Sequence, residues 1–380
     1  MIDTQSIKEW IVAHSDEMFE LLKDLCLIPA PSHHEEQRAA YCKEWLEKNG
    51  AKGVVIDSAL NVLFPLNCEG SSDITVFVAH TDTVFPDTEP MPYSDVDGIV
   101  RCPGVGDDTA SLAVMMMMAK YYLEIGYTPK GGILFVANSC EEGLGNLKGT
   151  RQFFEDYKGR IARFVSFDSN ISIVNERCVG SHRYEVEVRT QGGHSYQAFG
   201  IPNAINELSG IVREIYSIDL PRKEGCRVTY NVGDISGGTS VNTIAQSARM
   251  LCEYRSDDLS LLSFMEGEFA RIFEGAKKEG VEVLVKRIGD RPCAAEIDPV
   301  AFAALRDTCT AALTDTVDVT PTYRSASTDC NIPLSLGIPA ICIGVYVGGG
   351  SHTREEWVEK ASMIPGLEIA IKVGFGLTEK

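Results

Sequence analysis

The chain has 380 residues, of which 44% are hydrophobic and 23% charged, values typical of a soluble globular protein with more than one domain. Its formal net charge of -19 would repel a phosphate backbone, and no run of Lys and Arg offsets it locally, so nucleic acid is not an expected partner. The 12 cysteines are scattered without a CxxC pair, which favours reduced thiols over a disulfide framework.

The first 17 residues have an amphipathic pattern that lacks the basic start and the apolar core of a signal peptide. No later apolar run reaches the roughly 20 residues that a membrane span requires. We therefore expect a cytoplasmic protein that does not enter a membrane.

The first part of the chain has the pattern of a doubly wound α/β sheet, with strands and helices alternating up to about residue 175. A helix is predicted over 4–27. Three apolar runs, at 74–79, 132–138 and 162–167, are interpreted as buried strands. Further helices are predicted over 110–124 and 147–157.

A different pattern begins near residue 183, where polar and apolar residues alternate over 184–189 and predict a half-exposed strand. The predicted elements that follow are a helix (202–216), two strands (227–232 and 243–254), a helix (259–278) and a strand (281–287). This is the order of a split βαβ, ferredoxin-like domain. We therefore expect an inserted α+β domain at 183–292.

The α/β pattern then resumes with a helix (299–313), a strand (340–345) and a last helix (361–377). Residues 1–182 and 293–380 are thus expected to form one discontinuous domain around a mostly parallel sheet.

Metal-binding side chains follow each of the three predicted buried strands: His80 and Asp82 the first, Glu141 and Glu142 the second, and Asp168 the third. The carboxyl ends of such strands meet at one edge of the sheet, so these groups would gather there. Clustered carboxylates and imidazoles are costly to bury unless a divalent cation neutralises them. The pattern therefore predicts a metal site at this edge.

Within the first pair, His80 and Asp82 lie two apart on a strand and point the same way. His80 is therefore a candidate ligand whose second ring nitrogen Asp82 would hold. An HxD pair alone is weak evidence, because it often occurs by chance.

The segment Gly104 to Thr109 lacks the third glycine of a dinucleotide fingerprint, since Thr109 stands in its place. Asp108 is expected to cap the following helix. That leaves Asp107 as the candidate ligand, with two oxygens that could bridge two cations.

Glu141 and Glu142 are adjacent and point in different directions, so one could bind metal while the other acts as general base. An isolated pair of this kind is usually a solvated surface feature, but the apolar run before it makes that reading less suitable here. His352 follows three glycines that let the backbone approach a ligand closely. His194 belongs to the insert.

Taken in order, the motifs HTDTV, GDD, CEEG, FD, GGHS and GGGSH resemble those of the di-zinc metallopeptidase family that contains peptidase T, carboxypeptidase G, succinyl-diaminopimelate desuccinylase and the aminoacylases. The resemblance extends from about residue 76 to residue 357. Within this family, the chain is expected to be similar to peptidase T.

The resemblance implies two Zn²⁺ ions per subunit, with Co²⁺ or Mn²⁺ as possible substitutes. The ligands that it implies are His80, Asp107, Glu142, Asp168 and His352, with Asp107 bridging the two ions. His80 and Asp168 would complete one site, and Glu142 and His352 the other.

The same resemblance assigns catalytic roles to three residues. Glu141 would be the general base, Asp82 would orient His80, and His194, often supplied by the partner subunit in the family, would stabilise the oxyanion. Asn242 and Arg255 would contact the substrate, although Asn242 could instead satisfy a turn and Arg255 pair with an acidic neighbour. A homodimer through the inserted domain is expected.

The substrate is less well defined by the sequence. At the position of Asp168, the peptidase T and dipeptidase branches of the family tend to carry Asp. The carboxypeptidase and desuccinylase branches tend to carry Glu there. The Asp of this chain therefore favours an aminopeptidase of short peptides. The alternative is a deacylase or carboxypeptidase that acts on N-acyl amino acids. A third possibility is a catalytically silent binding protein, which would have lost the base or a metal ligand. A fourth is a thiol hydrolase using Cys140, which would need an activating histidine beside the thiol.

Overall fold

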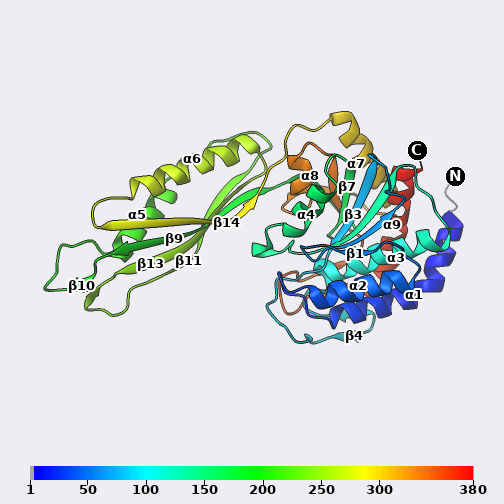
Figure 1. The fold of residues 1–380 in the computed structure, drawn as a ribbon, viewed down its shortest axis with the longest axis horizontal. Coiled ribbons are helices and arrows are strands. Elements are labelled where there is room, and N and C mark those ends of the chain that lie inside the picture. Colours follow the sequence, from blue (N-terminus) through cyan, green and yellow to red (C-terminus); the bar gives the residue numbers. More distant parts are fainter. Residues whose placement is uncertain (1–3, 380) are drawn as a thin grey trace. The chain divides into compact units, whose positions relative to one another are not determined.

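The computed structural model describes residues 4–379, and the chain divides into two compact units (Figure 1). Unit 1 comprises the residues up to Cys178 together with those from Ala295 onward, and unit 2 runs from Val179 to Ala294. Unit 2 is a few residues longer at each end than the insert predicted from the sequence.

Unit 1 is built on an eight-stranded sheet in the order β1-β2-β6-β3-β7-β16-β8-β15. In that order the strands are β1 (Val55–Ile56), β2 (Val62–Leu66), β6 (Gly132–Asn138), β3 (Ile74–His80), β7 (Ile161–Phe167), β16 (Ala340–Ile343), β8 (Ile173–Cys178) and β15 (Thr322–Ala326). The central strands β6, β3, β7 and β16 are mutually parallel, and β8 is parallel to β15. The pairs β1–β2, β2–β6 and β16–β8 are antiparallel. The prediction of a mostly parallel sheet is confirmed.

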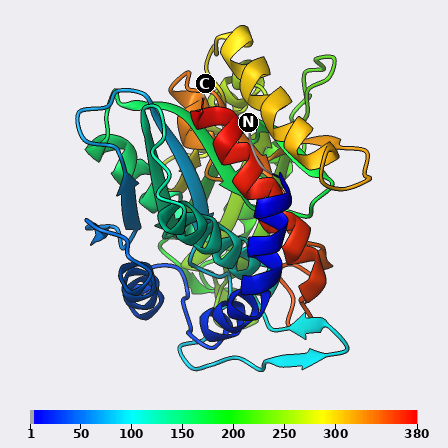
Figure 2. The same ribbon diagram turned by 90° about the vertical axis from the view of Figure 1, so that its right-hand side faces the viewer.

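Helices cover both faces of this sheet, so its central strands β3 and β6 are buried at every residue. Phe167 of β7 stacks on Phe77 of β3, and both belong to a core that includes α1, α3 and α9, whereas Phe164 of β7 stacks on Phe153 of α4. Figure 2 shows α1 beside α9. The helices of unit 1 are α1 (Thr4–Cys26), α2 (Glu36–Lys48), α3 (Ser111–Glu124), α4 (Lys148–Asp156), α7 (Pro299–Thr314), α8 (Asn331–Ser335) and α9 (Met363–Thr378).

One helical segment, Lys360–Thr378, is long and apolar enough to cross a membrane by length and composition alone, a possibility that the sequence analysis did not identify. Two thirds of it, 67%, is buried within the protein. Its apolar side chains, such as Leu367 and Ile371, belong to the core of unit 1, as expected for the core helix of a globular domain.

A small antiparallel sheet of unit 1, in the order β17-β18-β5-β4, joins distant parts of the chain. Its strands are β17 (Gly348–Gly349), β18 (Trp357–Glu359), β5 (Ile99–Arg101) and β4 (Ser94–Val96). Because β18 pairs with β5, the loop that carries His352 and the segment that leads to Asp107 are held together.

Unit 2 is an antiparallel sheet in the order β11-β13-β9-β14, with two helices on one face, so the predicted split βαβ arrangement is confirmed. The strands are β9 (Gly180–Thr190), β11 (Val228–Gly237), β13 (Ser247–Ser256) and β14 (Val281–Arg291), and the helices α5 (Ala204–Ile215) and α6 (Leu259–Gly275). Val186 and Val188 of β9 are buried against the helices, whereas the alternate residues Glu185 and Glu187 are partly exposed. A short ladder pairs β10 (Gly193–His194) with β12 (Thr243–Ile244).

Candidate metal centre

Three neighbouring parallel strands of unit 1 deliver the predicted side chains to one edge of the sheet. β3 ends at His80, β6 ends at Asn138 just before the turn of Glu141 and Glu142, and β7 ends one residue before Asp168. His80 is paired with Asn138 in the ladder between β3 and β6. The carboxyl ends of parallel strands are where α/β sheets place their ligand sites.

Asp107 lies at the centre of the cluster, in the segment η1 (Val105–Ala110) before α3, where the backbone departs from helical geometry. Its Oδ1 is 3.1 Å from His80 Nε2, and its Oδ2 is 3.1 Å from His352 Nε2. Ligand atoms of His80, Asp107 and Asp168 lie within 4.8 Å of one another, as do those of Asp107, Glu142 and His352. The two triads share Asp107, and each holds one histidine and two carboxylates.

The charges of these groups act strongly on one another. Burial and then the charge of Asp107 raise the pKa of Asp168 well above its ordinary value, and burial raises the pKa of Glu142 to about 7, although His352 acts against it. Burial also favours a raised pKa for Asp107, but the two histidines hold it well below its usual range. The cluster is therefore an excess of mutually repelling carboxylates that positive charge would stabilise.

The side chains fit a pair of divalent cations. Glu142 Oε1 is buried and accepts no hydrogen bond within the described residues, and His352 Nε2 lies 3.4 Å from it. An imidazole with two carboxylates is a donor set that Zn²⁺ accepts, and Co²⁺ and Mn²⁺ accept it as well.

Asp82 is fully buried. Its carboxylate was expected to hold the ring of His80, but its shortest contacts are with other groups. Nδ1 of His80 is 2.9 Å from the backbone oxygen of Asp82 and 3.4 Å from its carboxylate. The carboxylate oxygens accept hydrogen bonds from the backbone N–H groups of Glu141 (2.9 Å) and Glu142 (3.0 Å) and from the hydroxyl of Ser32 (2.7 Å). Asp82 thus holds both the histidine and the glutamate turn.

A second buried carboxylate, Glu35, supports the same turn and was not identified from the sequence. Its Oε1 accepts from the backbone N–H of Cys140 (3.0 Å) and from the thiol of that residue (3.3 Å). Cys140 has a φ of 57°, in the left-handed region that is unusual for a residue other than glycine. The N–H contacts of Glu35 and Asp82 thus fix three consecutive residues ending at Glu142.

The thiol of Cys140 does have a histidine nearby, since its Sγ is 3.4 Å from His33 Nδ1. Burial, together with the charges of Glu35 and Asp82, raises the pKa of this thiol to about 12. A thiolate nucleophile needs the opposite shift, so the environment of Cys140 disfavours the thiol hydrolase.

Two further aspartates lie behind the cluster. Asp108 was expected to cap α3, and this is wrong: its Oδ2 accepts from the backbone N–H of His80 (2.9 Å), and α3 begins without a side-chain cap. Asp329, which the sequence analysis missed, accepts hydrogen bonds from Thr150 and from Asn138, the latter at 2.8 Å. The cluster is thus backed by a shell of hydrogen-bonded carboxylates.

The other three predicted residues belong to unit 2. His194 is exposed on β10, and its Nδ1 accepts from the backbone N–H of Tyr196 (3.3 Å). Asn242 accepts from Ser240 Oγ (3.0 Å) in an exposed turn. Arg255 makes two hydrogen bonds to Glu253, at 2.7 and 3.0 Å, so the acidic neighbour considered from the sequence is present.

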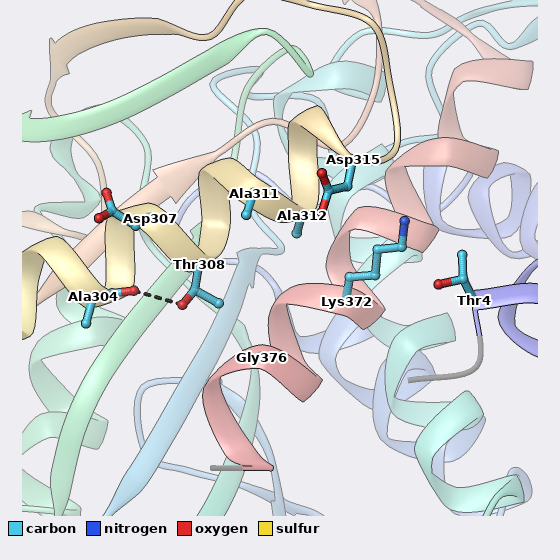
Figure 3. A pocket seen from close by; sticks show the side chains of 9 residues that line it. All are labelled: Thr4, Ala304, Asp307, Thr308, Ala311, Ala312, Asp315, Lys372 and Gly376. Atoms are coloured by element: carbon cyan, nitrogen blue, oxygen red, sulfur yellow. Dashed lines mark hydrogen bonds between the residues drawn. The ribbon is translucent and has the colours of Figure 1, made fainter. Parts of the chain in front are cut away.

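A pocket of about 650 Å³ elsewhere in unit 1 has none of these groups (Figure 3). Its lining residues are Thr4, Ala304, Asp307, Thr308, Ala311, Ala312, Asp315, Lys372 and Gly376. Lys372 is already paired with Glu368 (2.6 Å), and the described lining residues include no histidine or cysteine. The chemistry of unit 1 is concentrated at the edge of the sheet.

Comparison with known proteins agrees with this geometry. Residues 76–373 match the model of the peptidase family M20/M25/M40. The chain belongs to this family. Among relatives, it is 22% identical over 283 residues to the succinyl-diaminopimelate desuccinylase of Bordetella pertussis, covering 70% of this chain and 73% of the relative. A protein of Ajellomyces capsulatus described as "Probable carboxypeptidase" is 25% identical over 272 residues, 62% of this chain and 60% of its own length.

Solved structures share the fold along nearly the whole chain. The aminopeptidase PepT of Bacillus cereus has a TM-score of 0.74 at 20% identity, over 96% of this chain and 98% of its own. The dipeptidase Dug1p of Saccharomyces cerevisiae has a TM-score of 0.75 at 14% identity, over 100% and 99%. A Bacillus subtilis member with a TM-score of 0.67 at 14% identity, over 95% and 98%, is described as a dinuclear metal-binding peptidase.

Proposed function

We propose that the protein is a di-zinc aminopeptidase that releases the N-terminal residue from short peptides. The observation that carries the proposal is the pair of triads that share Asp107, with Glu141 next to one of their ligands on a firmly held turn. His80 and Asp168 would complete one site, and Glu142 and His352 the other. Two bound divalent cations supply Lewis acidity, which acidifies a water molecule and polarises the scissile carbonyl.

Glu141 is the general base of the proposed reaction. It is buried, with 5% of its surface exposed, and its charge contributes to the raised pKa of Asp168 after burial and Asp107, so it lies near the same cluster. Its carboxylate takes the proton of the attacking water and later returns it to the leaving amine. Asp82 fixes the backbone N–H of Glu141 and so determines where this base lies.

In the proposed reaction, His194, of this chain or of the partner subunit, stabilises the oxyanion, and Asn242 and Arg255 contact the substrate. His194 is suited to this task because its side chain is exposed on a short β ladder. Arg255 is hydrogen-bonded to Glu253, so a substrate carboxylate would compete with that glutamate for its guanidinium group.

We propose that two subunits pair through unit 2. Among the described strands, β11 pairs with β13 alone, so its other edge is open, and Ile235 on this strand is 54% exposed. Light scattering should give the mass of a dimer, and a monomer at all concentrations would contradict the pairing.

An N-acyl amino acid deacylase or carboxypeptidase is the second candidate, because the relatives include a desuccinylase and a protein described as a carboxypeptidase. All three activities use the same metal centre and base. They differ in whether the substrate must carry a free α-amino group or a free α-carboxylate.

The deciding experiment is hydrolysis of a tripeptide panel, free or blocked at either end, by protein stripped of metal and then given Zn²⁺, Co²⁺ or Mn²⁺. Metal-dependent release of the N-terminal residue, abolished by N-blocking, supports the aminopeptidase. Activity on N-blocked substrates alone would transfer the protein to the second candidate. Inactivity with every metal would favour a binding protein that has kept the fold.

A further inference from the structure

Glu356 is a buried carboxylate, 1% exposed, that the proposed reaction does not use. Its Oε2 accepts a hydrogen bond from the backbone N–H of Gly104 (2.6 Å), and its Oε1 accepts from Gly106 (3.0 Å) and Asp107 (2.8 Å). One side chain therefore binds three N–H groups of the turn that presents Asp107.

The turn is also packed tightly against this carboxylate. A Cβ atom added at Gly106 would lie 3.0 Å from Glu356 Oε1 and 3.0 Å from the hydroxyl oxygen of Tyr346. The backbone oxygen of Glu356 accepts from Cys102 N (3.3 Å), so backbone and side chain hold the same segment. Little room is left for the turn to move while Glu356 is in place.

Glu356 lies in the same short loop as His352, between β17 and β18. The loop thus reaches Asp107 twice: His352 Nε2 is 3.1 Å from its Oδ2, and Glu356 holds its backbone N–H. The aspartate shared by both triads and a histidine of one of them are therefore fixed to each other.

We infer that Glu356 is a positioning residue that aims the two oxygens of Asp107 at the two cation sites. The inference deepens the proposed function and rests on its metal centre. Since Asp107 belongs to both triads, removing the support weakens binding at both sites, whereas loss of a residue that belongs to one triad weakens one. Groups that orient metal ligands typically contribute about 10–100-fold in affinity.

Two variants test this assignment from opposite sides of the contact. Glu356→Gln keeps the shape of the side chain but turns an NH₂ group, which cannot accept a hydrogen bond, towards backbone N–H donors. Gly106→Ala leaves Glu356 intact and crowds its Oε1, and the glycine has no positive φ that would make alanine strained. Glu355→Gln is the matched control, because Glu355 is the exposed neighbour.

The readout is the affinity for Zn²⁺ alone, measured by competition with a chelating dye on the metal-stripped full chain. We expect both sites to weaken by about tenfold or more in the two test variants and to change by less than about twofold in Glu355→Gln. Thermal unfolding of the metal-free proteins accompanies the titration. If Glu356 has only a structural role, the variants will have a lower melting temperature. Their Zn²⁺ affinity, measured well below that temperature, will be unchanged.

The inference is overturned if the wild type binds two Zn²⁺ ions and Glu356→Gln has unchanged Zn²⁺ affinity at both sites. It is also overturned if Glu356→Gln weakens Zn²⁺ binding at one site alone. A wild type that binds no Zn²⁺ would overturn the proposed metal centre and this inference with it. If Glu356→Gln does not fold, Gly106→Ala decides between the same outcomes.

Discussion

Asp82 binds the backbone N–H of Glu141 at 2.9 Å, although the two residues are far apart in the sequence. The contact joins the end of β3 to the turn after β6. Asp82 therefore fixes the candidate ligand His80 and the candidate base Glu141 relative to each other. An aspartate next to His80 would be expected to serve the imidazole alone, but here its carboxylate serves mainly the glutamate turn.

The first prediction concerns this aspartate. Asp82→Asn should lower kcat by about 10–100-fold, because an amide can accept from Glu141 or Glu142 but not from both. Peptide hydrolysis at saturating substrate measures it, with Asp97→Asn as control, since Asp97 is exposed and has a φ of 53° that asparagine tolerates. An unchanged kcat would show that the turn does not depend on Asp82.

The second prediction separates the base from the ligands. Glu141→Gln should reduce turnover by about 10²–10⁴-fold while metal content stays at the wild-type value, because the amide cannot accept the proton of water. Turnover and metal content are measured on the same preparation, with Glu155→Gln on the surface of α4 as control. Undiminished turnover would refute the proposed mechanism.

The third prediction follows from the shared aspartate. His80→Ala and His352→Ala should each retain one tightly held metal ion, whereas Asp107→Ala should retain none, since both triads include Asp107. Elemental analysis after dialysis gives the count, and the exposed His34→Ala serves as control. Two ions retained by Asp107→Ala would exclude the bridging role.

The fourth prediction tests unit 2 in catalysis. His194→Ala should lower turnover by about 10²-fold or more, as removal of one oxyanion donor usually does, without loss of metal. The exposed Asn206→Ala on α5 is the control for a surface change in the same unit. Wild-type turnover would assign His194 no part in the reaction.

The fifth prediction concerns the stability of unit 2. Asp258 caps α6 by accepting from Leu261 N (3.1 Å); burial opposes its charged form, but hydrogen bonds, first from Lys223, lower its pKa to about 2. A depressed pKa stabilises the fold above the unfolded value of about 3.9 and loses this effect as pH falls towards 2.

Asp258→Asn keeps a good cap but removes the charge, so after solvent screening of the half-exposed Lys223 it should cost about 1 kcal/mol at pH 7 and about half as much at pH 3. Urea denaturation followed by circular dichroism measures the difference, with the exposed Asp219→Asn as control. A cost that does not change with pH would contradict the assignment to charge.

The long periodic elements were predictable from the sequence, because apolar runs such as 74–79 and the alternation over 184–189 carry their burial pattern directly. β15 (Thr322–Ala326) was not predicted, since an exposed edge strand has no apolar run. Helix α2 was also missed. The antiparallel pairing of β16 with β8 depends on long-range order that no local pattern contains.

The candidate site was predicted through its ordered motifs, and the ligand and base roles stay predictions until metal binding and turnover are measured. Glu35, Asp329 and Glu356 were missed because each acts on residues distant in sequence, largely through backbone N–H groups. An isolated glutamate carries no local signature of such a task. A usable signal was the position of Glu356 in the loop of His352.

The discontinuity of unit 1 has a consequence for synthesis of the protein. His352 and β16, the central strand that lies between β7 and β8, come after the whole of unit 2 in the chain. A nascent chain that has emerged as far as Ala294 therefore carries the first triad, but neither the completed sheet nor the second triad. The proposed metal centre can form only when the last segment arrives, so we expect an unfinished chain to be inactive towards the peptides around it.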